Sequence, residues 1–263
     1  MNAPRATYIH GTEAAEQQRL RELNRLTNDA FVDFLDVRPA SRVLEVGSGL
    51  GLLAYRVARA ADGVRVVGVE LSPAQIVQAV RSDRVTYVEA DAHALPLGDG
   101  AFDLAYTRYV LEHVRRPTAV LLEMYRVLRP GGRVAVLEND ISLARLDPPC
   151  PAFDEVWAAF GRLQHELGGD GFIGRRLFGL VTAAGFRHVE LSVQPELHWH
   201  GSPGWKAWVE NIIGNVASAR VALAARGLSR DAAIDRAIAE LRALIDRPEA
   251  SATFVWNRAR GVR

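Results

Sequence analysis

The sequence predicts an α/β fold built around a mostly parallel β-sheet, and three observations point to this fold class. Short valine-rich runs such as 42–46 and 65–70 alternate with stretches of helical periodicity, which is typical of strand–helix–strand units. The first run ends in a turn with glycines at positions 47, 49 and 51. Acidic residues, Glu70 and Asp91, stand at the ends of the next two runs. Since ligands bind at the carboxyl ends of the strands in such sheets, we expect these residues to share one site.

Seven strands are expected, each at a run rich in apolar or β-branched residues. They cover residues 42–46, 65–70, 85–89, 102–106, 133–139, 186–193 and 253–258. Helices are expected at 50–61, 118–128, 153–167 and 175–184, and a further helix begins at Ser72-Pro73. Proline suits the first position of a helix because the N–H that it lacks would have no partner there.

Two further helical regions flank these units. Residues 12–37 repeat leucine and phenylalanine at helical spacing, which predicts an N-terminal helical cap. Residues 201–249 separate the last two strands and predict a helical insertion, as a substrate lid, a homodimer contact or a surface excursion. We expect a single domain over residues 1–263, with a cofactor-binding core at 38–140 and a substrate-side half at 141–263.

Composition narrows the function. The chain has 263 residues with 32 basic and 31 acidic side chains, and no basic block that would follow a phosphate backbone, so a nucleic-acid partner is not expected. The single cysteine, Cys150, excludes an internal disulfide and makes a cysteine metal site implausible. No apolar run reaches membrane-spanning length, and the N-terminus lacks the apolar segment of a signal peptide. We therefore expect a cytoplasmic enzyme that acts on a small molecule.

The glycine turn indicates a nucleotide-like cofactor, and two cofactors compete for it. A dinucleotide site would begin its G-x-G-x-x-G pattern at Gly47 and Gly49 and place Glu70 on a ribose. Its third glycine would then stand at position 52, which is Leu52. S-adenosylmethionine (SAM) has no pyrophosphate and does not need that glycine. The spacing therefore favours SAM.

The acidic residues also suit SAM. A carboxylate accepts two hydroxyl donors well, as Glu70 would from a ribose diol. Asp91 would accept a hydrogen bond from the adenine amino group, and the N–H of Ala92 would donate to a ring nitrogen. Glu45, inside a buried strand, is costly unless it is hydrogen-bonded. It is easier to explain beside the N–H groups of the turn or beside a cationic amine.

Six motifs in series over residues 40–140 strengthen this interpretation. They are 43–51 (VLEVGSGLG), 67–72 (VGVELS), 89–92 (EADA), 95–104 (LPLGDGAFDL), 110–114 (VLEHV) and 123–132 (EMYRVLRPGG). In this order and spacing they resemble the class I SAM-dependent methyltransferases. The resemblance is nearest to the small-molecule branch, which includes the ubiquinone and menaquinone biosynthesis C-methyltransferases.

The resemblance implies a Rossmann-like sheet of seven strands, the last antiparallel, with helices on both faces. It implies that the three glycines line the methionine end of SAM, that Leu71 packs on the adenine, and that residues after the fourth strand contact the methionine portion. With Glu45, the expected cofactor-binding set is Glu45, Gly47, Gly49, Gly51, Glu70, Leu71, Asp91, Ala92, Thr107 and Arg108.

The candidate catalytic residues are groups that can accept a proton near the methyl acceptor. Positioning supplies much of the rate of methyl transfer, and a general base helps when the nucleophile is a hydroxyl or an acidic carbon. His113, His10, His198 and His200 are the candidate bases, with Tyr8 and Tyr109 as orienting groups; His198 and His200 follow the sixth strand. Whether an O, N or C nucleophile is methylated stays open.

Other interpretations stay open as well. They are a nicotinamide-dependent oxidoreductase and a non-catalytic SAM-binding scaffold protein. Oxygen ligands at 138–140 would suit Mg²⁺, but hydrogen-bonding roles are the more common ones for such groups, and no metal is expected. Aromatic residues of the C-terminal half would favour an apolar or aromatic acceptor if several line one cavity. These residues are Phe153, Trp157, Phe160, Phe172, Trp199, Trp205 and Trp208.

Overall fold

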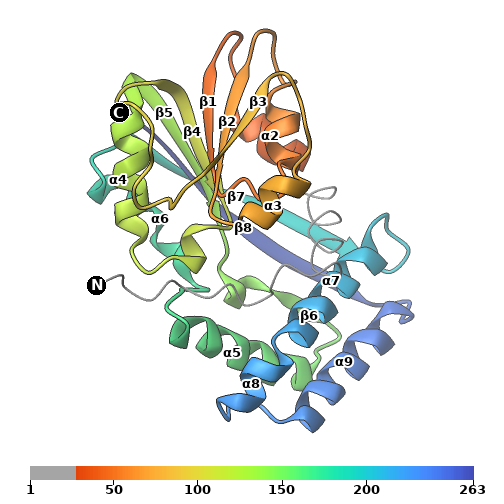
Figure 1. Cartoon of the computed structure of the whole chain (residues 1–263). Coiled ribbons are helices and arrows are strands. Elements are labelled where there is room, and N and C mark those ends of the chain that lie inside the picture. Colours follow the sequence, from red (N-terminus) through yellow and green to blue (C-terminus); the bar gives the residue numbers. More distant parts are fainter. Residues whose placement is uncertain (1–27) are drawn as a thin grey trace.

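The computed structural model describes residues 28–263, and these residues form one mixed eight-stranded sheet with helices around it (Figure 1). The parallel part consists of β1 (Arg42–Val46), β2 (Arg65–Glu70), β3 (Val85–Glu89), β4 (Phe102–Arg108) and β5 (Leu128–Glu138). Its order is β3-β2-β1-β4-β5. The mostly parallel α/β sheet is confirmed, and β1, β2 and β3 begin and end at the expected residues.

The expected count of seven strands was wrong by one. The additional strand, β6 (Arg145–Asp147), has three residues, too few to show a period of two in the sequence. It forms because β8 (Ser251–Val262) is longer than expected and has free backbone to share. One side of β8 pairs antiparallel with β7 (Arg187–Trp199) along its length. The other side is divided between β5 and β6.

The helices form two groups. Around the sheet are α2 (Leu52–Val57), α3 (Pro73–Gln78), α4 (Pro117–Val127) and α6 (Leu177–Ala183). A separate helical lobe contains α5 (Pro151–Glu166), α7 (Trp205–Ser218), α8 (Arg220–Ala225) and α9 (Asp231–Ile245), and it lies below the sheet in Figure 1. The helical insertion before the last strand is confirmed. Residues 28–35 are also helical, whereas the rest of the expected N-terminal helix lies outside the described residues.

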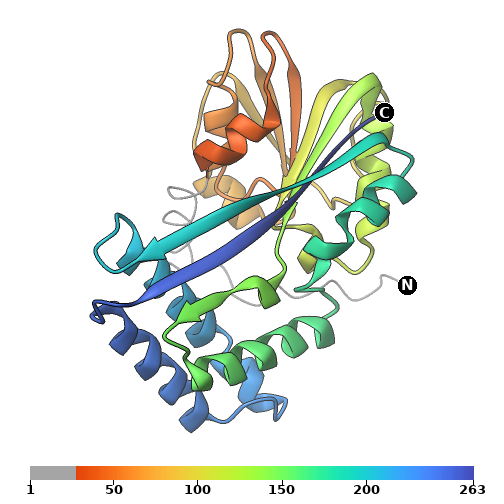
Figure 2. The ribbon, with the colours of Figure 1, turned by 180° about the vertical axis from the view of Figure 1, so that it is seen from behind.

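Strands β7 and β8 form a two-stranded arm that runs from the sheet to the helical lobe (Figure 2). Residues opposite each other in this arm project to the same face. Glu196 lies opposite Phe254, and Gln194 lies opposite Trp256. The alternate residues of β7 are exposed, among them Leu197 and Trp199. The arm therefore presents one face to the molecule and the other to solvent.

Two buried apolar clusters stabilise this arrangement. One contains Val43 of β1 and Tyr106 of β4 and continues without a break to Trp208 and Leu241 of the helical lobe. The other lies on the opposite face of the sheet, under α4 and α6, and contains Leu44. Because the first cluster spans both parts, apolar burial fixes the lobe against the sheet.

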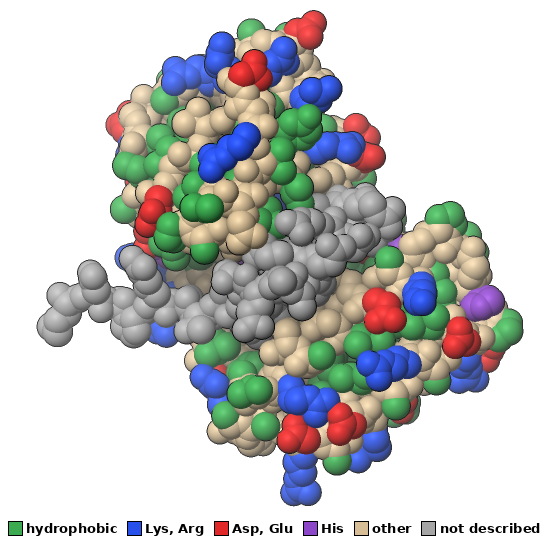
Figure 3. All heavy atoms as spheres, turned by 45° about the vertical axis from the view of Figure 1, so that its right-hand side comes forward, with side chains coloured by type: hydrophobic (Ala, Val, Ile, Leu, Met, Phe, Trp, Pro, Cys, Tyr) green, Lys and Arg blue, Asp and Glu red, His purple; other side chains and the backbone are tan. Residues whose placement is uncertain are grey.

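The surface has mixed charge. On the face shown in Figure 3, the Lys and Arg side chains of the described residues are interspersed with Asp and Glu, in keeping with a net charge of +1. No helix within residues 28–263 is long and apolar enough to cross a membrane.

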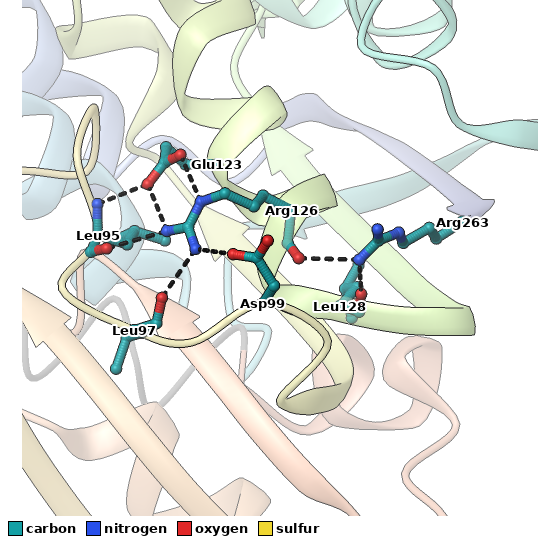
Figure 4. Close-up of polar contacts among 7 residues, drawn as sticks. All are labelled: Leu95, Leu97, Asp99, Glu123, Arg126, Leu128 and Arg263. Carbon is teal, nitrogen blue, oxygen red and sulfur yellow. Dashed lines mark hydrogen bonds and ion pairs between the residues drawn. The ribbon is translucent and has the colours of Figure 1, made fainter.

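Arg126, in the expected motif at 123–132, joins α4 to the loop before β4 (Figure 4). Its guanidinium donates to both carboxylate oxygens of Glu123, at 2.9 and 2.8 Å, and to Asp99 at 2.6 Å. It also donates to the carbonyl oxygens of Leu95 and Leu97, at 3.0 and 2.8 Å. Three of these five hydrogen bonds, to Leu95, Leu97 and Asp99, thus hold a loop that has no regular structure.

We expect Arg126→Ala to lower the free energy of unfolding by about 2–3 kcal/mol, because it leaves Glu123 and two carbonyl groups without their charged donor. Urea denaturation measures this loss. Arg129→Ala is the matched control, since Arg129 is more exposed and pairs mainly with Asp103; it should cost less than about 1 kcal/mol. Equal losses for the two variants would contradict the assignment of Arg126 as the organising side chain.

Candidate active site

A cavity of about 670 Å³ lies at the carboxyl ends of β1, β2 and β4 and reaches the helical lobe. Eight of the ten residues that were expected to bind the cofactor line it: Glu45, Gly47, Gly49, Glu70, Leu71, Asp91, Ala92 and Arg108. These residues come from four separate segments of the chain. The order of the strands brings them together, as the α/β fold predicts.

Gly51 and Thr107 do not belong to the cavity wall. Gly51 has a φ of +68°, and a Cβ atom there would collide with the ring and hydroxyl of Tyr87. The glycine is therefore required by the backbone conformation and by Tyr87. The Thr107 side chain is fully buried, and its hydroxyl donates to the carbonyl oxygen of Val46 at 3.1 Å. Thr107 thus joins β4 to the end of β1.

Glu70 organises the cofactor end of the cavity. Its Oε2 accepts a hydrogen bond from the N–H of Gly49 at 2.9 Å, and its Oε1 accepts one from the N–H of Ser72 at 2.9 Å. Each oxygen has a second lone pair, so the carboxylate can also accept two ribose hydroxyls. Leu71 is 42% exposed beside it and offers an apolar surface.

Asp91 and His93 form a second polar group on the wall. Asp91 Oδ1 accepts from the backbone N–H of His93 at 2.9 Å and lies 2.6 Å from His93 Nδ1. The other ring nitrogen, Nε2, is buried without a partner among the described residues. His93 was not among the expected site residues. Its signal in the sequence was its place two residues after Asp91, within hydrogen-bonding reach of that side chain.

Glu45 is a buried carboxyl group beneath the glycine turn. Burial raises the pKa of Glu45 to about 8, and Arg108 offsets part of this rise. The pKa of Tyr106 is raised as well, by burial and by the neighbouring Glu45. Glu45 is therefore mostly protonated at neutral pH, and a bound cationic amine would favour its charged form.

Arg108 is the cation beside Glu45. Its guanidinium donates to Asn28 Oδ1 at 2.8 Å and lies over the rings of Phe31 and Tyr109, 5.6 and 5.2 Å from their centroids. These contacts fix the guanidinium at the cavity wall. It can therefore serve a carboxylate ligand, such as the methionine end of a cofactor.

We call the part of the cavity near His113 and the helical lobe, where a methyl acceptor would bind, the acceptor end. It contains a buried carboxylate, Glu112, that was not among the expected site residues. Glu112 is 4% exposed and accepts hydrogen bonds from Asn139 Nδ2 at 2.7 Å and Gln164 Nε2 at 3.1 Å. His113 Nε2 lies 3.6 Å from Glu112 Oε1, and both residues line the cavity. The expected base His113 thus lines the cavity, next to the carboxylate of Glu112.

Glu138 stabilises the backbone of residues 110–112, which precede His113. Its carboxyl accepts hydrogen bonds from the N–H groups of Val110, Leu111 and Glu112, at 3.0, 2.8 and 3.2 Å. Burial and the nearby Glu112 carboxylate raise the pKa of Glu138 well above its usual value. The carboxylate of Asp140 accepts two hydrogen bonds from the guanidinium of Arg175, at 2.7 and 2.8 Å. Residues 138–140 therefore act as hydrogen-bonding groups, and the described residues contain no cluster of three or more metal-ligating side chains.

Two other candidate proton acceptors, His198 and His200, are described by the structure and do not line the cavity. His198 stacks on Trp208 with ring centroids 5.4 Å apart and does not line the wall. His200 is exposed. Tyr8 and His10 lie outside the described residues.

Aromatic side chains cover much of the acceptor end: Tyr109, Trp157, Phe160, Trp208, Phe254 and Trp256 line the cavity. Of the aromatic set singled out in the sequence, Trp157, Phe160 and Trp208 are at the wall. Phe153 and Trp205 are buried in the core, whereas Phe172 and Trp199 are exposed. Phe254 and Trp256 were missed, although their alternation along the last strand is a period-two signal.

Comparisons with known proteins agree with this geometry. Residues 44–136 match a family model described as a methyltransferase domain. The chain is 37% identical over 177 residues to an uncharacterised 37.1 kDa protein in transposon TN4556 of Streptomyces fradiae, covering 65% of this chain and 50% of that protein. It is 34% identical over 123 residues to a ubiquinone/menaquinone biosynthesis C-methyltransferase of Cereibacter sphaeroides, covering 44% of this chain and 49% of that enzyme. The chain thus spans about half the length of these relatives.

A solved structure shares the fold at lower sequence identity. Phosphoethanolamine N-methyltransferase 2 of Haemonchus contortus, in complex with SAM, superposes with a TM-score of 0.52 at 19% identity, covering 94% of this chain and 52% of that one. At this identity the likeness shows the fold alone. The chemistry of the cavity residues by itself fits SAM, because Glu70 has lone pairs for a ribose and the Glu45–Arg108 pair suits an amino-acid end.

Proposed function

We propose that this chain, whose residues 44–136 match a family model described as a methyltransferase domain, is a class I SAM-dependent methyltransferase that transfers a methyl group from SAM to a nucleophile of a small molecule. The observation that carries the proposal is the cavity itself, which has cofactor-binding groups at one end and an aromatic wall with His113 at the other. Residues 38–140 would bind the cofactor, and residues 141–263 would supply most of the acceptor wall.

At the cofactor end, three side chains would do the binding. Glu70 would accept the ribose hydroxyls, Arg108 would hold the carboxylate, and Glu45 would hold the amine in its ionised form. When bound, SAM supplies an already activated methyl group on a sulfonium. The protein then has mainly to exclude water and hold the acceptor in line.

At the acceptor end, His113 is the candidate general base. It lies on the cavity wall and faces Glu112, whose carboxylate would stabilise the imidazolium after His113 takes a proton. Asn139 and Gln164 hold that carboxylate, so His113 receives a fixed neighbour. Tyr8 and His10 would add to this group from the N-terminal segment.

Calorimetry tests the cofactor. We expect SAM and S-adenosylhomocysteine to bind at micromolar concentrations and NAD to show no binding at millimolar concentrations, because the turn lacks the third dinucleotide glycine. Tight binding of NAD without binding of SAM would replace the proposal with the oxidoreductase alternative. Transfer of a labelled methyl group to members of a metabolite panel would separate an enzyme from a silent scaffold.

We further propose that the protein acts in the cytoplasm. Its methyl acceptor would be a small molecule rather than a nucleic acid. We also propose that the protein forms a homodimer through its C-terminal helices. Light scattering after size-exclusion chromatography would test for that dimer.

A further inference from the structure

One buried carboxylate of the acceptor end lies among aromatic rings. Glu196 lies on β7, and its side chain is 9% exposed. Because Glu196 is opposite Phe254 in the β7–β8 register, both side chains project from the same face of the arm. Trp208 of α7 approaches from the helical lobe, and its indole N–H donates to Glu196 Oε2 at 3.2 Å. All three side chains line the cavity.

The surroundings of Glu196 are rich in negative potential and poor in cations. Trp256 packs on Phe254 with ring centroids 4.5 Å apart, and the faces of aromatic rings carry negative partial charge. Among the basic side chains that the structure describes, His198 is the one within ion-pair distance, at 3.9 Å from Glu196 Oε2. A carboxylate in such a wall is costly unless a cation neutralises it.

The geometry points to a methyl acceptor that carries an ammonium group, bound between the Glu196 carboxylate and the rings of Trp208 and Phe254. Aromatic faces attract organic cations, and the effect grows when the cation is desolvated beside them. An anionic group in this position would instead face the Glu196 carboxylate. The apolar remainder of the wall, with Trp157 and Phe160, suits an apolar body on the same molecule.

This inference rests on the proposed function, since it names the acceptor class for the same cavity. The test compares two ligands that differ in one group. Tyramine carries an ammonium group, and 4-propylphenol has a methyl group in its place. Binding to the full chain, saturated with S-adenosylhomocysteine, is followed by the fluorescence of the wall tryptophans with excitation at the red edge of indole absorption.

We expect tyramine to bind at least about tenfold more tightly than 4-propylphenol. Glu196→Gln keeps an acceptor for the Trp208 N–H and removes the charge, so the preference should fall below about twofold. Glu190→Gln is the matched control, because Glu190 is an exposed glutamate on the same strand, paired with Arg260; it should keep the preference.

Equal or tighter binding of 4-propylphenol by the unchanged protein would overturn the inference, and so would a Glu196→Gln variant that keeps the full preference. If that variant does not fold, the comparison of the two ligands on the unchanged protein decides alone. The two proposals fail separately. Loss of SAM binding in calorimetry removes the methyltransferase, whereas normal SAM binding without a preference for tyramine removes only the acceptor class.

Discussion

Replacing Glu70 with alanine is expected to weaken SAM binding by about 100-fold. The substitution would remove the acceptor for two ribose hydroxyls, and hydrogen bonds to a charged group contribute about 1.5 kcal/mol or more each. It would also leave the N–H groups of Gly49 and Ser72 without the carboxylate that now accepts from them. The glycine turn would lose one contact with the end of β2 and keep the hydrogen bonds from the N–H groups of Gly47 and Ser48 to the carbonyl oxygen of Val69. Calorimetry with SAM measures the effect.

Glu89→Ala is the matched control for this prediction. Glu89 ends β3 at the position that is paired with Glu70 in the parallel register, but it is exposed and does not line the cavity. Its removal should change the affinity for SAM less than about twofold, since it gives up no contact with the cofactor. If Glu70→Ala bound SAM as tightly as Glu89→Ala, the ribose assignment would be incorrect.

Glu45→Gln is expected to stabilise the protein at pH 8 by about 3–5 kcal/mol while changing its stability little at pH 4.5. The folded protein keeps the Glu45 proton up to a pKa of about 8, whereas the unfolded chain releases it near 4.5, the ordinary pKa of a glutamate. Between these values the folded state binds more protons, so the contribution of Glu45 to stability falls as the pH rises. Each pH unit in this window costs about 1.4 kcal/mol, and glutamine does not titrate.

Urea denaturation of both proteins at the two pH values checks this prediction. The difference between the proteins removes the effect of every other titrating group. An identical difference at pH 4.5 and pH 8 would show that Glu45 is charged in the folded protein. In the same variant we expect weaker binding of SAM, because the amide cannot neutralise the cationic amine. The same buried carboxyl would thus cost stability at pH 8 and, under the proposed function, supply a contact to the cofactor.

The sequence predicted the parts of this site that depend on local signals. Gly47, Gly49 and Glu70 stand at the ends of strongly patterned strands, and the parallel topology leaves one edge of the sheet where they can meet. Gly51 shows the limit of this reasoning. Gly51 leaves room for the side chain of Tyr87, which is distant in sequence. The sequence alone does not distinguish a glycine that binds a ligand from a glycine that makes room for a side chain.

The missed residues depend on long-range contacts. Glu112 was quoted in a motif, but its role follows from Asn139 and Gln164, which approach it from 27 and 52 residues away. The strand β6 exists only because β8 has free backbone beside it. Glu196, Phe254 and Trp208 form one group only through the register of the arm and the approach of α7. No window of the sequence contains these relations.

The divided pairing of β8 leaves a gap between the residues paired with β5 and those paired with β6. Residues 257–262 are held by β5 and residues 251–253 by β6, so 254–256 have a strand neighbour on the β7 side alone among the described residues. Pairing with a strand therefore holds this short length of β8 from one side only, within the part of the chain that the structure describes. It also carries Phe254 and Trp256. The gap between β5 and β6 thus coincides with the residues that supply two rings of the cavity wall.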